Sequence, residues 1–157
     1  KGKNVTTFNI GDNVFGTTTM LKTGSYAEYI CLPQQWKHGV VGLKPVNLNF
    51  KEAAALPIGG MTALFLLEKA RISKGQKILV YGASGSVGSY AVQIAKSFDA
   101  SVTGVCSTLN IEMVKSLGAE KVIDYTNAKK NIKPKDERNN FSRRKWYTFI
   151  SNYKRSF

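Results

Sequence analysis

A glycine-rich turn between a short apolar run and an amphipathic segment constrains the fold of this chain more than any other feature. The apolar run at residues 78–81 predicts a buried strand, and the turn at residues 82–88 follows it directly. Apolar residues then recur at helical spacing, namely Val87, Ala91, Ile94, Ala95 and Phe98. A strand, a glycine turn and a helix in this order bring backbone N–H groups and the positive end of a helix dipole to one point, which favours phosphate binding.

The glycines of this turn are expected to have separate roles. Ala83 stands where the usual G-x-G-x-x-G pattern has its first glycine, so the pattern here is A-x-G-x-x-G. Gly85 would let the backbone approach the pyrophosphate of a dinucleotide, and Gly88 would let the helix lie close to the strand. We interpret the turn as a dinucleotide site, with a purely structural turn as the alternative.

Two further strands complete a repeating unit. Ser101–Cys106 and Lys121–Asp124 read as strands, and a short helix that ends at Gly118 lies between them. Its apolar positions are Ile111, Val114 and Leu117. A β-α-β-α-β alternation with short connections predicts an α/β fold with a parallel sheet and right-handed crossovers.

The residues after the second strand bear on the choice of cofactor. An Asp or Glu at this place usually binds the ribose 2′-OH of NAD and would repel a 2′-phosphate. Residues 106–110 contain no acid, and the first one that follows is Glu112. The sequence therefore favours NADPH over NADH.

Further motifs occur in a family-specific order, at residues 11–16, 24–29, 52–57, 59–64, 117–119 and 122–125. Together with the glycine turn, they resemble the medium-chain dehydrogenase/reductase superfamily, most closely its quinone oxidoreductase (zeta-crystallin-like) branch. The resemblance extends over residues 5–126. It implies a GroES-like β-barrel followed by a Rossmann-type sheet, hydride transfer from NADPH to a quinone or an activated C=C bond, and a homodimer for an intact member.

The resemblance also implies cofactor contacts at individual positions. Five residues match the pyrophosphate turn: Ser84, Gly85, Ser86, Val87 and Gly88. Ser107 and Tyr125 match positions that reach the adenosine ribose and its 2′-phosphate. Thr62, expected to open a helix, matches a position near the nicotinamide. No catalytic acid, base or nucleophile stands out, as expected when the cofactor carries the chemistry.

The chain departs from the family pattern just after Ser107. Many relatives that use NADPH have Lys or Arg there, whereas this chain has Leu109 and Asn110. Neutral donors hold a phosphate less tightly than a paired cation does.

The resemblance divides the chain into three parts. Residues 1–50 match the C-terminal part of a GroES-like barrel, residues 51–127 the first half of a Rossmann domain, and residues 128–157 match neither. We therefore expect an incomplete and inactive oxidoreductase. The alternative is a non-catalytic fragment with at most nucleotide binding, or with a basic tail that contacts nucleic acid.

Local patterns predict several elements before the glycine turn. Strands are expected at residues 13–18 and 26–32. Residues 49–52 resemble a capping box that opens a helix, Pro57 is expected to end it, and a second helix is expected at residues 61–70. Tyr26 and Tyr29 are interpreted as packing residues, with substrate contact as the alternative.

The cysteines and the single histidine argue against a metal site. Cys31 and Cys106 are expected to be two buried thiols rather than a disulfide, and His38 an exposed loop residue. Two isolated cysteines and one histidine cannot supply a zinc ligand set. With no signal peptide and no apolar stretch expected to span a membrane, we predict a cytoplasmic location.

The positive charge is concentrated at the C-terminal end. The chain has a formal net charge of +13, of which residues 1–127 contribute +5 and residues 128–157 contribute +8. Three interpretations of this tail stay open: a nucleic-acid-binding arm, a disordered natural C-terminus, and the product of a frameshift or a mis-predicted gene end, which we favour. Within it, residues 146–150 alone could form a strand.

Overall fold

The computed structural model describes residues 1–19, 24–35, 37 and 39–127. Three parallel strands form its main sheet, in the order β3 (Lys77–Tyr81), β4 (Ser101–Cys106) and β5 (Lys121–Asp124). The β-α-β-α-β prediction is therefore confirmed. The expectations for His38 and for the basic tail lie outside the described residues.

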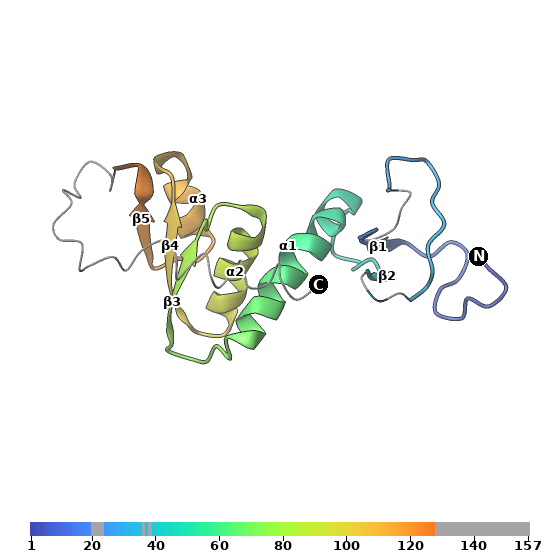
Figure 1. Ribbon diagram of the computed structural model, residues 1–157, viewed down its shortest axis with the longest axis horizontal. Coiled ribbons are helices and arrows are strands. Elements are labelled where there is room, and N and C mark those ends of the chain that lie inside the picture. The colour runs from blue at the N-terminus through green and yellow to red at the C-terminus, as the bar shows by residue number, and fades with distance from the viewer. Residues whose placement is uncertain (20–23, 36, 38, 128–157) are drawn as a thin grey trace.

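Two helices cover one face of this sheet (Figure 1). They are α2 (Ser86–Ser97) and α3 (Ile111–Ser116), and the 3-10 turn η1 (Thr108–Asn110) precedes α3. Apart from Leu67, the buried core consists of small and β-branched side chains: Ala63, Leu67, Ala83, Ala91, Val92, Ala95, Ala100, Val102, Cys106, Val114 and Ala119. Because these side chains are small, the helices approach the sheet closely.

Glycines allow the closest approaches in this layer. A Cβ at Gly104 of β4 would lie 2.6 Å from Val114 Cγ1 of α3. A Cβ at Gly88 would overlap the carbonyl oxygen of Gly82 and lie 2.9 Å from the Cα of Ala83. The predicted role of Gly88 in close helix–strand packing is therefore confirmed.

The long helix α1 (Phe50–Lys69) packs against the outer side of α2. Its predicted capping box is present: the Asn49 side chain accepts from the Glu52 N–H at 2.9 Å, and the Asn49 N–H donates to Glu52 Oε2 at 2.8 Å. The prediction that Pro57 ends this helix is wrong, as is the separate helix at residues 61–70. Pro57 removes one helical hydrogen bond, but its side chain is buried, so packing holds the helix together across it.

By length and composition alone, α1 could cross a membrane, contrary to the expectation that no segment would qualify. This is weak support for a membrane span, because core helices of soluble proteins pass the same test. Ala63 and Leu67 of α1 belong to the buried core.

A short antiparallel pair lies at the far end of α1, formed by β1 (Val14–Gly16) and β2 (Val41–Leu43). β1 confirms the expected strand at residues 13–18, but the strand expected at 26–32 is wrong. Tyr26 and Tyr29 are 109% and 90% exposed, so these side chains have no packing that would favour a strand. Cys31 is exposed in the same segment, which corrects the expectation of two buried thiols; Cys106 is buried.

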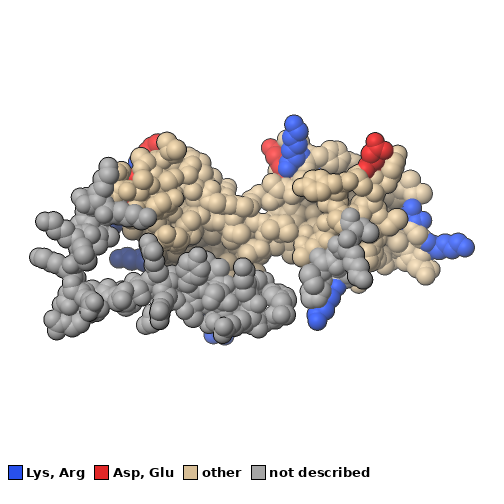
Figure 2. All heavy atoms as spheres, turned by 45° about the horizontal axis from the view of Figure 1, so that its top comes forward, with Lys and Arg blue, Asp and Glu red and all other residues tan. Residues whose placement is uncertain are grey.

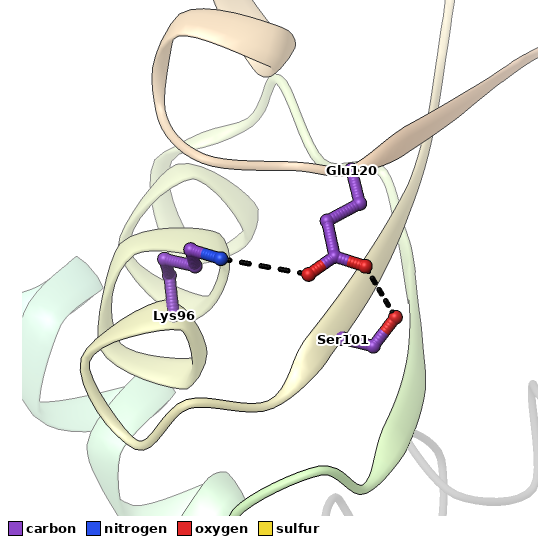
Figure 3. A network of polar contacts seen from close by, with 3 residues as sticks. All are labelled: Lys96, Ser101 and Glu120. Atoms are coloured by element: carbon purple, nitrogen blue, oxygen red, sulfur yellow. Dashed lines mark hydrogen bonds and ion pairs between the residues drawn. The ribbon is translucent and has the colours of Figure 1, made fainter.

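A polar network ties the amino end of the sheet to α2 (Figure 3). Ser101 Oγ donates to Glu120 Oε2 at 2.6 Å, and Lys96 Nζ lies 3.5 Å from Glu120 Oε1. The Ser101 hydrogen bond, together with Lys96 and Lys121, lowers the pKa of Glu120. The charged carboxylate is therefore the form that the fold stabilises.

We expect Gly88→Ala to lower the free energy of unfolding by about 1–3 kcal/mol, because the added methyl meets backbone that cannot move aside. Urea denaturation followed by circular dichroism measures the change. Gly85→Ser is the matched control, because a Cβ there meets only Gly82 O, at 3.4 Å, and serine suits a helix N-cap. Equal losses in the two variants would contradict the close-packing argument.

Glu120 should make stability depend on pH in the acidic range. Its pKa is lower in the folded chain, so its contribution is complete above the ordinary glutamate pKa of about 4.3 and is lost as pH falls through the folded value. Glu120→Gln should therefore flatten the loss of stability on acidification, as measured by urea midpoints between neutral and acidic pH. An unchanged pH dependence would show that the network does not couple to folding.

Candidate functional site

The loops after β3, β4 and β5 meet at one edge of the sheet, because the strands are parallel. The loop after β3 turns sharply at Gly82, whose φ is +75°. The N–H groups of Gly82 and Ala83 both donate to the carbonyl oxygen of Val105 at 3.0 Å. The start of the glycine turn is thus bound to the end of the neighbouring strand β4.

The first turn of α2 presents backbone donors at this edge. Gly85 is the N-cap, with no side-chain cap, and the Ser89 N–H makes the first helical bond to the Gly85 carbonyl at 2.9 Å. The N–H groups of Ser86, Val87 and Gly88 have no partner within the helix. Gly85 and Ser86 are exposed, so these donors and the helix dipole are accessible to an anion.

The structure brings two predicted residues together through a third. Asn110 Nδ2 donates to Ser84 Oγ at 3.3 Å and to Ser107 Oγ at 3.0 Å. Ser84 belongs to the glycine turn, whereas Ser107 directly follows β4. From the sequence, Asn110 was noted only because it stands where many relatives have a cation. Its position three residues after Ser107 was the signal that could have predicted the contact between them.

A carboxylate that sequence reasoning missed also lies at this edge. Asp124 of β5 is paired in register with Cys106 of β4. Its oxygens accept from Thr108 Oγ1 at 2.7 Å, from the Thr126 N–H at 2.8 Å and from the Asn127 side chain at 2.8 Å, with the Asn127 N–H at 3.4 Å.

These hydrogen bonds, that of Thr108 above all, lower the pKa of Asp124, so it is charged at neutral pH. Burial, and then the Asp124 charge, raises the pKa of the neighbouring Cys106 thiol. The carboxylate oxygens are occupied by four donors, which leaves little capacity to accept from a ribose hydroxyl. The acid at this edge therefore contributes charge rather than a free hydrogen-bond acceptor.

Among the described residues, the other two predicted ones make no side-chain hydrogen bond to this cluster. Tyr125 follows Asp124 and is exposed. Thr62 lies inside the continuous helix α1, so it does not open a helix as expected, and it makes no hydrogen bond to the glycine turn. The part of α1 that contacts the start of α2 is Gly59, where a Cβ would lie 2.6 Å from Ser86 Oγ.

No cluster of three or more His, Cys, Asp or Glu side chains suited to a metal occurs within residues 1–19, 24–35, 37 and 39–127. A hollow of about 610 Å³ lies near the N-terminus, bordered by Phe8, Val14, Cys31 and other residues of that region. This hollow is remote in sequence and in structure from the glycine turn, where the backbone N–H groups and serine hydroxyls of the candidate site lie. Neither observation tests for zinc, so its absence stays a prediction.

The chain was compared with known proteins. No protein-family model matches it. It is 50% identical over 105 residues to the 2-methylene-furan-3-one reductase of Solanum lycopersicum, covering 66% of this chain and 26% of that protein. It is 42% identical over 111 residues to the chloroplastic NADPH-dependent alkenal/one oxidoreductase of Arabidopsis thaliana, covering 69% and 27%.

Among solved structures, the quinone oxidoreductase from Coxiella burnetii superposes with a TM-score of 0.70 at 32% identity, over 84% of this chain and 41% of that one. The chain belongs to the medium-chain dehydrogenase/reductase superfamily. Within it, the similar proteins are quinone oxidoreductases and enone reductases. The chain spans about a quarter of the length of the two relatives named above.

Membership of the medium-chain dehydrogenase/reductase superfamily accounts for the layout of the chain. The sheet β3-β4-β5 with α2 and α3 is the expected Rossmann-type sheet, and β1 and β2 belong to the GroES-like part that precedes it. The domain boundaries at residues 50 and 127 stay predictions.

Proposed function

We propose that this chain is the dinucleotide-binding part of an NADPH-dependent oxidoreductase that reduces a quinone or an activated C=C bond. The observation that carries the proposal is the open first turn of α2, with the hydroxyl groups of Ser84 and Ser107 held at the same sheet edge. Backbone N–H groups, a helix dipole and hydroxyl donors together suit the phosphates of a dinucleotide.

The residues present fit such a cofactor at the glycine turn. A Cβ at Gly85 would meet only the Gly82 carbonyl, at 3.4 Å, and would otherwise occupy open space in front of the helix. Ser86, Val87 and Gly88 would hold the pyrophosphate through their N–H groups, and Ser107 and Tyr125 would bind the adenosine ribose. When bound, NADPH supplies the hydride; this part of the protein binds and orients it.

The preference for NADPH over NADH rests on the residues around β4. Residues 106–110 contain no acid, and the Asp124 oxygens are already engaged. The name of the Arabidopsis relative, an NADPH-dependent alkenal/one oxidoreductase, supports the same choice. This proposal includes a small-molecule quinone or enone as the substrate and a homodimer as the assembly. It also includes a cytoplasmic location, although the Arabidopsis relative is chloroplastic.

We propose that residues 1–157 alone do not catalyse the reaction. The sheet face opposite α2 and α3 exposes Leu79, Tyr81 and Ile123, and α1 exposes Ile58 and Met61. Exposed apolar areas of this kind favour association or a loosely packed state. The face of the described residues that Figure 2 shows carries only scattered charges, so this face offers no basic patch for a nucleic acid. The basic tail lies outside the described residues.

We expect Gly85→Val to weaken NADPH binding by at least about tenfold, because a branched side chain would stand where the pyrophosphate approaches the backbone. Titration of the full chain, followed by nucleotide fluorescence, measures the affinity. Val46→Ala, in an exposed side chain between β2 and α1 and outside the candidate site, serves as the control. Unchanged affinity in a folded Gly85→Val variant would exclude the turn as the pyrophosphate site.

Ser107→Asp should reverse the cofactor preference. Two charges about 4 Å apart near a protein surface repel by roughly 1–4 kcal/mol, so NADPH should bind at least about fivefold more weakly, while the new carboxylate can accept from the 2′-OH of NADH. The ratio of the two dissociation constants is the measurement. A preference of the unmodified chain for NADH would contradict the proposed cofactor.

The catalytic proposal has its own test. Residues 1–157 should oxidise NADPH with a quinone no faster than a buffer blank. Turnover on the order of 1 per second or more by a monomer would show that the described elements suffice for catalysis.

A further inference from the structure

Asn110 is the side chain that joins the glycine turn to the end of β4. It is partly buried, and its amide nitrogen lies 3.3 Å from Ser84 Oγ and 3.0 Å from Ser107 Oγ. Its backbone N–H donates to the Ser107 carbonyl at 3.0 Å, which closes the turn η1. One residue thus fixes two hydroxyl groups that come from loops 23 positions apart in the sequence.

The direction of these hydrogen bonds determines what the two hydroxyls can do. An amide nitrogen has two N–H donors and no acceptor, whereas a hydroxyl has one donor and two acceptor sites. When Asn110 donates to both oxygens, each hydroxyl keeps its own O–H proton for another acceptor. A phosphate at the sheet edge is an acceptor of that kind, and hydrogen bonds to a charged acceptor are the stronger ones.

The charged groups that the structure describes around this edge leave the two hydroxyls as donors to a phosphate, because none of these groups is a free cation. Asp124 is negative, and its side chain is bonded to Thr108 in the same 3-10 turn as Asn110. Lys115, the cation of the adjoining helix α3, is paired with Glu112 at 2.9 Å. Among the contacts of the described residues, neutral donors rather than a cation therefore face the edge.

We propose that Asn110 is a positioning residue, which holds the Ser84 and Ser107 hydroxyls as two donors to the phosphates of one bound nucleotide and thereby sets the affinity for NADPH relative to NADH. The inference rests on the proposed function and extends it to a residue that does not itself touch the cofactor. Ser84 acts on the pyrophosphate, which both nucleotides have. Ser107 acts at the ribose, where the 2′-phosphate distinguishes them.

The test is a double-mutant cycle in the full chain, with dissociation constants for NADPH and NADH from fluorescence titration. Asn110→Ala should weaken NADPH by about tenfold and NADH by about threefold, in line with the loss of oriented hydrogen bonds to charged groups. In a Ser107→Ala background, the same change should alter the NADPH-to-NADH ratio by less than about twofold, because the group that Asn110 orients is gone. Val46→Ala, in a fully exposed side chain between β2 and α1 and outside the candidate site, is the control.

The outcomes separate a positioning role from a structural one. The inference is overturned if Asn110→Ala changes the affinity for neither nucleotide. It is also overturned if the substitution shifts the NADPH-to-NADH ratio of dissociation constants equally with and without Ser107. Asn110→Asp keeps the size of the side chain and replaces its N–H donors by acceptor oxygens. It should weaken NADPH binding at least as much as Asn110→Ala is expected to. This variant keeps the inference testable if the alanine variant unfolds. An unmodified chain that binds neither nucleotide would instead overturn the proposed function itself.

Discussion

The close contact between the first turn of α2 and the end of β3 is the constraint on which the rest of this structure depends. Only a residue without a Cβ fits at Gly88, because the carbonyl of Gly82 occupies the space. This contact brings the amino end of the helix to the edge of the sheet, and the Val105 carbonyl then fixes the turn through two N–H groups. The open donors of α2 consequently face the same edge as the loops after β4 and β5.

The chemistry of that edge is a balance between neutral donors and one negative charge. The helix dipole, the free N–H groups and the two serine hydroxyls attract phosphate, while the Asp124 carboxylate repels it. Asp124 is stabilised by four donors and is thus a structural acid, which also ties η1 to the sheet. In the proposed function, recognition of a phosphate at this edge depends on how the hydroxyls are oriented, because no contact of the described residues supplies a cation.

The fold was predictable where short-range patterns decide it and not where packing does. The three parallel strands and the capping box at Asn49 follow from local residue patterns, and both are present. Pro57 misled the prediction of α1, because the burial of its side chain offsets the loss of one helical hydrogen bond. The segment around Tyr26 and Tyr29 has the composition of a strand, but strands need partners, and β2 pairs with β1 instead.

The sequence by itself determined the strand–turn–helix unit, the need for glycine in it and the family to which the chain belongs. The first two depend on residues within a few positions of one another, so local sterics and periodicity suffice. The family resemblance rests on the order of motifs spread over residues 5–126. Only the tertiary structure decided that Asn110 connects two serines and that Asp124 lies beside η1. Those contacts join residues 26 and 16 positions apart. They form because parallel pairing brings the ends of separate strands to one edge, and no local pattern specifies which side chains meet there.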